Sequence, residues 1–526
     1  MKKILAVLLV LTMLLHSGCG SMPAGNPTET RTDSSKPNLS GETVEIILDG
    51  QTVTVNGEAA GDGGTAVYIS QDIVYYEEKT TYESGNPYGE GSEADMHTAE
   101  EAANHLVVNI TQPGNYRLSG KLDLGQIRID LGEDAYDDPN AVVNLILDGV
   151  DITCTVGPAI VFQNVYECDG DWSADTAGAE VDTTAAGANL LLAEDSENIV
   201  RGSYVAKIFK DKEGEKKLWK QDGAIYSYMS MNVFGPGCLD LYAENEGLDT
   251  ELHLTIYGGE INIRSGNDGI NTNEDGVSVT TINGGVVHII AGLGEEGDGI
   301  DSNGYLVING GVVMAFANPA ADAGLDSDLG SYINGGTVIA LGSAMDWAES
   351  DSSQVTMNLQ FAGQQEAGSA IVITRNGDEV FCYYPAQDEN LGDDTRSFRG
   401  AIISCPDFRV GDSYQVFVGG QQMAYTGTDV MGHGPGGFGG MGPGGGVTPP
   451  GDMPQPPESD FTVPGKPGEQ PGIPAGDPPT MPEGGMPGGM GSRPGQQGSS
   501  AGEPNILFYM QDKVNFFSGL RAYAAE

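Results

Sequence analysis

Acidic and amide side chains recur at fixed intervals in the middle of this chain. Four times the sequence places a Gly-(Ile/Leu)-(Asp/Asn)-(Ser/Thr)-(acidic/Asn) turn before a β-branched run and a Gly-Gly pair. The Gly-Gly pairs begin at positions 258, 284, 310 and 335, so the intervals are 26, 26 and 25 residues. Carboxylate and amide oxygens are the ligands that calcium prefers. The repeat therefore predicts a divalent-cation site to which several copies of the turn contribute.

The alternation of side chains along a strand predicts which members of each turn share a face. If Ile300 and Ser302 point into the protein, Asp301 and Asn303 point outward, and the other three copies follow the same rule. Stacked copies then form two outward columns, and a third, less regular column lies just before the turns. The three columns are Asp249, Asn271, Asp301 and Asp326; Glu251, Asn273, Asn303 and Asp328; and Glu246, Asp268, Asp298 and Asp322. The aspartates and asparagines among them are the predicted calcium ligands.

Electrostatics favours a bound cation at these columns. Parallel strands lie about 4.8 Å apart, and two carboxylates at that distance repel by roughly 3.5 kcal/mol at an effective dielectric of about 20. Between Asp222 and Met345 the chain has 17 acidic residues and one basic residue, Arg264. Calcium takes oxygen ligands at about 2.3–2.6 Å, so one ion can bridge neighbouring repeats. The alternative is that Asp, Asn and Gly stand here because they tolerate tight turns.

The elements that must position these side chains are short strands. A fixed period of about 25 residues is typical of a solenoid, in which each unit stacks on its own copy. The units have the composition of strands and turns, so we expect an all-β solenoid over residues 41–345. From Asp346 the period is lost while strand-like segments persist, which predicts a β-rich C-terminal cap over residues 346–431. Such a cap covers the open edge of the last repeat.

The N-terminus has the features of an export signal. Two lysines, an apolar run and Ser17-Gly18-Cys19 predict a signal peptide over residues 1–19. The last part resembles the lipobox of bacterial lipoproteins, which implies that Cys19 is lipidated and that the protein stays on the extracellular face of the cell membrane. Ordinary secretion is the alternative. Residues 20–40, rich in Ser, Pro, Thr and Asn, predict a flexible tether.

The C-terminal part of the chain is divided by composition. Residues 432–503 are rich in Gly, Pro and Met, which predicts a disordered segment. The apolar residues of 504–526 follow neither a helical nor a strand period, so the tail receives no predicted role. Five cysteines remain after Cys19, an odd number. Cys382 and Cys405 either pair with each other or remain as thiols.

The overall charge limits the classes of partner. The chain has 24 Lys+Arg against 75 Asp+Glu, for a formal net charge of -51. Nucleic acid is excluded as a partner because phosphate binding needs a basic face. Clustered oxygens suit divalent cations instead. Contact with a membrane is expected through the lipid anchor only, and the oligomeric state is not predicted.

A basic stretch between residues 201 and 221 interrupts the acidic chain. Its composition predicts a hairpin that leaves the solenoid and returns. Lys212, Lys216, Lys217 and Trp219 are the predicted contacts to sugar acids, and a solvated loop of mixed charge is the alternative. The histidines at 253 and 288 are interpreted as strand residues and not as ligands or bases.

Several segments resemble the clostridial carbohydrate-binding β-helix family, whose members are exported and have a pectate-lyase-like fold. The resemblance covers roughly residues 41–425. It rests on Val143–Thr153 with Gly157–Ile160, on Asp222–Ser227, and on the Asp-Gly-Ile-Asp and Asn-Gly-Gly repeats. The resemblance implies a right-handed parallel β-helix, bound calcium, and affinity for an acidic plant polysaccharide such as polygalacturonate, with cellulose as a further ligand.

Three functions compete. The first is calcium-dependent, non-catalytic binding of an acidic polysaccharide at the cell surface. The second is a polysaccharide lyase on the same scaffold, which needs a Lys or Arg base near the acidic cluster, and the repeats offer only Arg264. A glycosidase would need two opposed carboxylates, which the columns do not single out. The third is a structural or adhesive surface protein.

Overall fold

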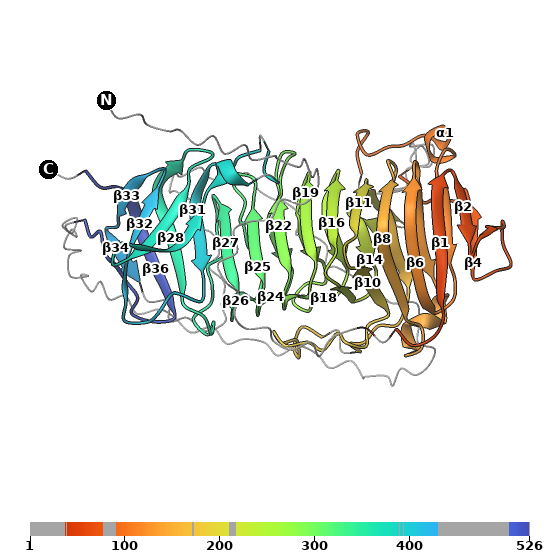
Figure 1. The fold of residues 1–526 in the computed structure, drawn as a ribbon, viewed down its shortest axis with the longest axis horizontal. Coiled ribbons are helices and arrows are strands. Elements are labelled where there is room, and N and C mark those ends of the chain that lie inside the picture. The colour runs from red at the N-terminus through yellow and green to blue at the C-terminus, as the bar shows by residue number, and fades with distance from the viewer. Residues whose placement is uncertain are drawn as a thin grey trace, which may run out of the picture.

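The protein is nearly all β. The computed structural model describes residue 37 and residues 39–76, 91–170, 173–209, 217–388, 390–392, 394–429 and 504–524. Figure 1 shows an elongated stack of strands that runs from β1 at one end to the C-terminal strands at the other. Within the described residues, α1 (Ala99–Ala102) is the single α-helix, and η2 (Glu133–Asp137) and η3 (Pro385–Gln387) are short 3-10 helices. No described helix is long and apolar enough to cross a membrane.

Most strands belong to three parallel ladders. Three consecutive strands, at Leu254–Ile256, Glu260–Ser265 and Ile270–Thr272, belong to ladders 1, 2 and 3 and define the numbering. Ladder 1 consists of β1 (Thr43–Gly50), β6 (Gly114–Leu122), the first half of β8 (Val143–Thr153), β10 (Ala188–Leu192), β15 (Met231–Phe234), β18 (Leu254–Ile256), β21 (Val279–Ile282), β24 (Tyr305–Ile308) and β26 (Gly330–Ile333). Ladder 2 consists of the second half of β8, β11 (Glu197–Gly202), β16 (Cys238–Ala243), β19 (Glu260–Ser265), β22 (Val286–Ile290), β25 (Val312–Phe316) and β27 (Thr337–Gly342). Ladder 3 consists of β5 (Leu106–Ile110), β7 (Gly125–Asp130), β9 (Ile160–Asn164), β14 (Gly223–Ser227), β17 (Glu246–Thr250), β20 (Ile270–Thr272) and β23 (Ile300–Ser302).

Each of the first three sequence repeats supplies one strand to each ladder, and the fourth supplies one strand to ladders 1 and 2 and a single bridge to ladder 3. The repeat that begins at Glu246 gives β17, β18 and β19, and the next gives β20, β21 and β22. Because equivalent strands pair side by side in parallel, equivalent residues of successive repeats become neighbours. The fixed period of the sequence is therefore the period of the strand stack.

Equivalent apolar side chains form columns inside the stack. Ile256, Ile282, Ile308 and Ile333 lie on successive rungs of ladder 1, and all are fully buried. Ile300 and Ser302 are also fully buried, which confirms the predicted inward side of the turn motif. The hydroxyl groups of the motif pair with one another, as where Thr272 Oγ1 lies 2.8 Å from Ser302 Oγ. Since an unpaired buried hydroxyl is costly, this pairing explains why polar Ser and Thr recur in the core.

The glycine that opens each turn is required by close packing between rungs. A Cβ at Gly247, Gly269 or Gly299 would collide with the backbone oxygen of the equivalent glycine one repeat later. A side chain would therefore push successive rungs apart. The Asn of each Asn-Gly-Gly segment links the same rungs, because Asn309 Nδ2 donates to Asn283 Oδ1 at 2.9 Å and Asn334 Nδ2 to Asn309 Oδ1 at 3.1 Å.

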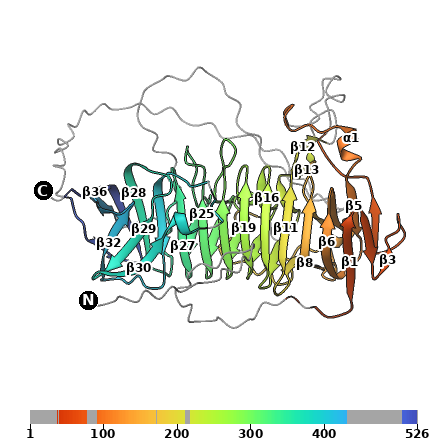
Figure 2. The ribbon, with the colours of Figure 1, turned by 45° about the horizontal axis from the view of Figure 1, so that its top comes forward.

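Antiparallel strands and a hairpin cover the N-terminal end. β2 (Thr52–Val55), β3 (Glu58–Ala59) and β4 (Val67–Ser70) pair antiparallel, β2 with β1 and β4 with β5. The predicted hairpin is confirmed as β12 (Val205–Phe209) and β13 (Lys217–Gln221), which pair antiparallel. Figure 2 shows this hairpin beside α1, and Tyr76 and Val205 form a small buried cluster there. α1 begins with a capping box between Thr98 and Glu101.

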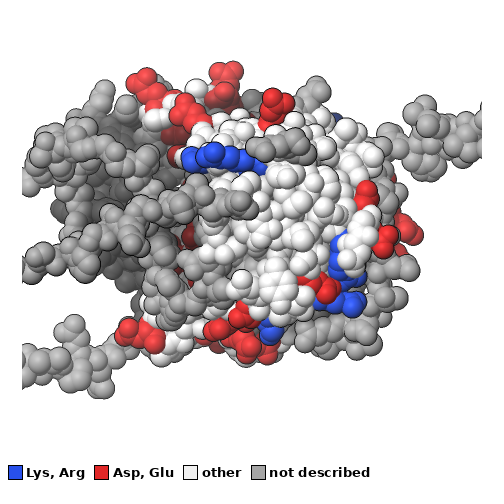
Figure 3. All heavy atoms as spheres, turned by 90° about the vertical axis from the view of Figure 1, so that its left-hand side faces the viewer, with Lys and Arg blue, Asp and Glu red and all other residues white. Residues whose placement is uncertain are grey.

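A second set of strands covers the C-terminal end. These strands are β28 (Thr356–Gln365), β29 (Ile371–Arg375), β30 (Asp378–Tyr383), β31 (Phe398–Ser404), β32 (Ser413–Val418), β33 (Gln421–Ala424) and β34 (Gly427–Asp429). β31 pairs antiparallel with β27, the last strand of ladder 2, and so ends the parallel pairing. Figure 3 views this end, where most described side chains are uncharged and the acidic ones lie toward the edges of the view.

The tail left without a role in the sequence is part of this end. It forms β35 (Phe508–Tyr509) and β36 (Val514–Ala522), and β36 pairs in parallel with β28. Phe508 and Phe517 are buried in the same core cluster as Phe361. The expected alternative of a Cys382–Cys405 disulfide is wrong, since both are free thiols: Cys382 is exposed on β30, and Cys405 is buried just after the end of β31.

Candidate functional site

The outer side of ladder 3 collects the predicted first column. Asp249 is the register partner of Asn271, and Asn271 of Asp301. A parallel bridge between Ile300 and Leu325 brings the following residue, Asp326, to the next rung. The members of the first column therefore lie on successive rungs of the ladder.

Three carboxylates meet at the start of this column. One oxygen each of Asp222, Glu246 and Asp249 lies within 4.8 Å of the others. Asp222 precedes β14, while Glu246 and Asp249 belong to the neighbouring strand β17. Gly223 leaves room for them, because a Cβ there would lie 2.5 Å from Asp249 Cβ. Sequence analysis missed Asp222 because it stands one rung before the repeats, and it left Glu246 out of the ligand set.

Burial makes this cluster unusual. Asp249 is fully buried and Glu246 is 5% exposed. On the next rung Asn271 is 6% exposed, and its Oδ1 has no hydrogen-bond partner among the described residues. Several carboxylates removed from water together are costly unless a positive charge compensates them. Three carboxylates and an amide oxygen match the hard oxygen ligands of calcium, so the residues present fit such an ion.

The second column links rungs through amide groups. Asn273 Nδ2 donates to Asp249 Oδ1 at 2.5 Å, and Asn303 Nδ2 donates to the backbone oxygen of Asn273 at 2.9 Å. At the head of the column, the Tyr226 hydroxyl donates to Glu251 Oε1. Asp328, at its end, is exposed. These asparagines therefore have a structural use that the sequence did not reveal.

The third column ties rungs together through the backbone. Asp268 Oδ1 accepts a hydrogen bond from the backbone N–H of Asp298 at 2.6 Å, and Asp298 Oδ1 accepts one from Ala323 at 2.5 Å. Asp322 Oδ2 likewise accepts from Gly297 at 2.8 Å. Each carboxylate thus holds the turn of a neighbouring repeat. These contacts agree with the alternative interpretation, in which the aspartates stabilise tight turns. Each contact uses one oxygen of its carboxylate, and the second oxygen can still bind a cation.

The same carboxylates resist ionisation. Burial, together with the nearby Glu246 carboxylate, raises the pKa of Asp268 well above its usual value. Burial raises the pKa of Asp298 to about 8, where the charges of Asp326 and Asp301 add to the effect against the hydrogen bond from Ala323. After burial, the groups that raise these values are other carboxylates. A cation at this surface would relieve both effects.

A further acidic pair lies at the far end of the column. Ser327 N–H donates to Asp326 Oδ1 at 3.0 Å and to Asp346 Oδ2 at 3.3 Å. Burial and the Asp326 carboxylate raise the pKa of Asp346 to about 7. Asp346 follows the last repeat, so the periodic pattern could not reveal it. The acidic surface therefore extends past the repeats at both ends.

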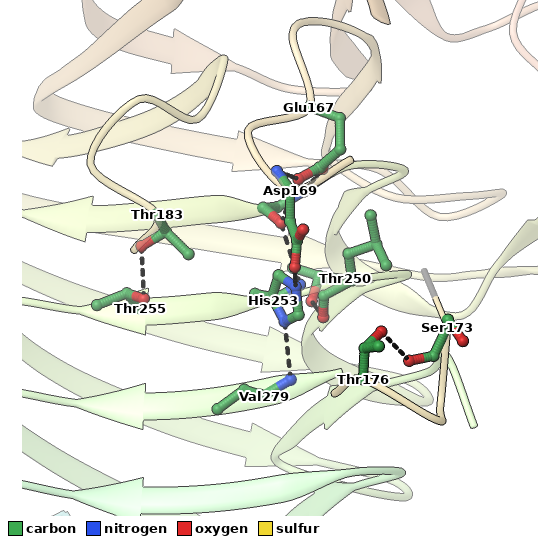
Figure 4. A network of polar contacts seen from close by, with 11 residues as sticks. Glu167, Asp169, Ser173, Thr176, Thr183, Thr250, His253, Thr255 and Val279 are labelled. Atoms are coloured by element: carbon green, nitrogen blue, oxygen red, sulfur yellow. Dashed lines mark hydrogen bonds and ion pairs between the residues drawn. The ribbon is translucent and has the colours of Figure 1, made fainter. Parts of the chain in front are cut away.

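An insertion between β9 and β10 covers the corner after β17. Figure 4 shows Asp169 and Glu167 of this insertion above His253. His253 Nε2 lies 3.2 Å from Asp169 Oδ2, and His253 Nδ1 accepts from the Val279 backbone at 3.1 Å. Glu167 accepts from Ser230 N–H at 2.7 Å. These contacts tie the insertion to residues that follow β14 and β17.

The predicted lysine contacts lie close to this surface in sequence. Lys217 and Trp219 belong to β13, which ends at Gln221, directly before Asp222. The structure does not describe their side chains. Lys212 and Lys216, and the predicted lipidation site Cys19, lie outside the described residues.

Fold and site together define an elongated β protein with an oxygen-rich outer ladder. A family model described as a carbohydrate-binding domain-containing protein matches residues 104–382, more than half of the chain. The chain belongs to this carbohydrate-binding domain family.

One curated relative and one solved structure are similar to this chain. A carbohydrate-binding domain-containing protein of Acetivibrio thermocellus is 30% identical over 159 residues, which are 30% of this chain and 45% of that protein. The chain therefore spans less than half of that relative. The solved structure is of the polysaccharide lyase-like protein from C. thermocellum, a gadolinium derivative. It is 21% identical, covers 56% of this chain and 93% of its own, and has a TM-score of 0.32, too low to support a conclusion.

Proposed function

We propose that this protein binds an acidic polysaccharide, such as polygalacturonate, through calcium held on ladder 3, without cleaving it. The observation that carries the proposal is the meeting of Asp222, Glu246 and Asp249 within 4.8 Å at a buried position. Membership of the carbohydrate-binding domain family supports a polysaccharide partner.

A bound calcium ion would offset the electrostatic repulsion between a protein of net charge -51 and an anionic ligand. Asp222, Glu246 and Asp249 would hold the ion, and the amide oxygen of Asn271 stands one rung away. A calcium ion accepts six to eight oxygens, so sites not filled by the protein remain for substrate carboxylates. The hairpin of β12 and β13, whose sequence contains the predicted lysine contacts, ends directly before Asp222.

A lyase receives less support from the site. The one basic residue that the repeats offer to a lyase, Arg264, lies on ladder 2. It forms an ion pair with Asp394 and donates from Nη1 to the Asn390 oxygen at 3.1 Å. A guanidinium held in an ion pair on a different ladder does not serve as a base beside the acidic columns. His253 is buried between Asp169 and Val279. These placements favour binding over catalysis.

The same proposal extends to the fold and the location. We infer that the three parallel ladders are the faces of a right-handed parallel β-helix, because each of the first three repeats supplies one strand to each ladder. Lipidation at Cys19 would hold the protein at the extracellular face of the membrane, where a polysaccharide is accessible.

Affinity electrophoresis in gels that contain polygalacturonate tests this function. We expect the protein to be retarded in calcium and to migrate freely in chelator, with no unsaturated product absorbing in the ultraviolet. Asp249→Asn should lose most of the retardation. Glu296→Gln is the matched control, since it removes one exposed acidic group from a turn of the same ladder.

The outcomes separate the candidate functions. Retardation that is unchanged by chelator would contradict the role of calcium. Unsaturated products would establish a lyase instead. Free migration under all conditions would contradict binding of this polysaccharide and leave the adhesive function.

A further inference from the structure

β36 lies inside the sheet of the C-terminal end although it is the last strand of the chain. It pairs in parallel with β28 on one side and antiparallel with β33 and β34 on the other. The strands β28 to β34 lie between Thr356 and Asp429, whereas β36 begins at Val514. A segment from the end of the chain therefore supplies a central strand to this sheet.

The place that β36 fills is a groove between two strand edges. Without β36, β28 would keep only β31 as a partner, and β34 would have no partner among the described strands. Free strand edges and exposed apolar surface both favour the capture of another strand. The side chains of the tail that fill the groove are each at most 2% exposed, and they are Phe508, Met510, Val514, Phe517 and Leu520.

The groove is shaped for this sequence. The pairing with β28 skips Gly519, whose φ is +66°, and a Cβ there would lie 2.4 Å from Thr426 Oγ1. A glycine is therefore required at this bulge. The Tyr425 ring packs against Phe508 and Phe517, with centroid distances of 4.8 and 5.0 Å. A strand of unrelated sequence would not satisfy both constraints.

The connection between the groove and the tail is much longer than its closure requires. Asn505 and Tyr425 exchange two backbone hydrogen bonds of 3.0 Å, so the two ends of the connection lie close together. Nevertheless, 74 residues separate Asp429 from Pro504 in the sequence. A chain of this length spans up to about 250 Å when extended. The advantage of a molecule's own strand over one from another molecule falls as such a connection lengthens.

Charge does not oppose insertion of the tail into a second molecule. Residues 504–524 contain two basic residues, Lys513 and Arg521, and one acidic residue, Asp512, within a chain of net charge -51. β28 and β33 contain no charged residue. Figure 3 shows that most described side chains at this end are uncharged. The strand and its groove are therefore spared the repulsion between two acidic chains.

We propose that residues 504–524 of one molecule insert into this groove of a second molecule, so that copies of the chain join through exchanged strands. The contacts between the molecules are those that the structure shows within one molecule. The partner is a second copy of this chain, because the bulge at Gly519 and the contacts of Tyr425 select this sequence. This interaction requires neither calcium nor a polysaccharide.

A cysteine pair across β28 and β36 tests the exchange in the full chain. Gln360 and Ser518 are register partners, so one copy carries Gln360→Cys and the other carries Ser518→Cys. Both also carry Cys382→Ser, because Cys382 is exposed. The two copies are produced in the same cells with different affinity tags, and mixed dimers are measured on non-reducing gels. We expect a disulfide-linked dimer that contains one copy of each.

Asp512→Cys, in place of Ser518→Cys, is the matched control. Asp512 is exposed in the same tail and does not pair with β28. Random collision would link both pairs equally, whereas strand exchange should give at least tenfold more dimer with Ser518→Cys. Equal yields of dimer for the two pairs would overturn the proposal.

A peptide tests the groove without a cross-link. Phe517→Asp in the full chain should expel its own strand and lower the thermal midpoint, because Phe517 is buried. A synthetic peptide of residues 504–524 should then restore the midpoint, and the same peptide with Phe517→Asp should not. The unmodified protein, whose groove is filled, should bind the peptide far more weakly. A midpoint of Phe517→Asp that the peptide leaves unchanged would also overturn the proposal.

Discussion

The same repeats form ladder 2 and ladder 3, but the carboxylates of the two ladders have different partners. On ladder 2, carboxylates meet cations or amides, as in Arg201 with Asp151 at 2.6 Å and Asn262 with Asp240 at 2.9 Å. On ladder 3, Asp268 and Asp298 have raised pKa values because of burial and of other carboxylates. Strand alternation alone cannot produce this difference. Part of it arises because a loop of the C-terminal end supplies a partner to ladder 2, where Asp394 pairs with Arg264.

The largest expected effect is the pH dependence of stability without metal. Asp298 has a folded pKa of about 8, so between its unfolded value and about pH 8 the folded chain binds more protons than the unfolded chain. The free energy of unfolding should therefore fall as pH rises, by about 1.4 kcal/mol per pH unit for each such group. Urea denaturation in chelator between pH 5 and pH 8 measures this slope.

A variant tests whether the Asp298 carboxyl causes this pH dependence of the free energy of unfolding. Asp298→Asn should flatten it, whereas Asp151→Asn on ladder 2 should not. Stability that is constant or that rises over this range would contradict the raised pKa values.

Calcium should restore the free energy of unfolding that is lost as the pH rises. At pH 8, a calcium concentration of about 100 times the dissociation constant adds about 2.7 kcal/mol to the free energy of unfolding. At pH 5 the increase should be smaller, because protons compete with the metal for the same oxygens. Denaturation with and without calcium at the two pH values tests this, and an equal increase at both would show that the ion binds elsewhere.

Removal of one member of the column should weaken calcium binding by a smaller amount. Asp301→Ala is expected to raise the dissociation constant roughly tenfold, which corresponds to about 1.4 kcal/mol, and to lower the thermal midpoint in calcium. Glu296→Gln, at an exposed position nearby, should match the unmodified protein. If the midpoint of Asp301→Ala in calcium is unchanged, Asp301 takes no part in holding the ion.

The smallest effect is expected on ladder 2. Arg201 is 43% exposed in its side chain, and its pair with Asp151 is therefore screened by water. Arg201→Ala should change the free energy of unfolding by about 0–1 kcal/mol and leave the calcium affinity unaltered. A large loss of calcium binding in this variant would remove the distinction between the two ladders.

The period of a strand and the spacing of the repeats were enough to predict how residues within and between repeats are arranged. The inward side of Ile300 and Ser302 followed from the two-residue period of a strand, and the rung order of Asp249, Asn271 and Asp301 followed from the spacing of the repeats.

Contacts between distant segments could not be predicted in this way. Asp222 and Asp346 flank the repeats, so no periodic pattern marks them as members of the acidic surface. β36 pairs with a strand more than 100 residues earlier, and its alternation is obscured by two adjacent Phe residues. Asn390, from the C-terminal end, donates to Asn262 of ladder 2 across 128 residues of sequence.

The most direct test is a crystal structure of the protein grown with calcium, with anomalous diffraction to identify the ion. A calcium ion coordinated at about 2.3–2.6 Å by Asp222, Glu246 and Asp249 is the predicted result. A well-ordered cluster with no ion at millimolar calcium, its carboxylates bonded only to protein and water, would contradict it.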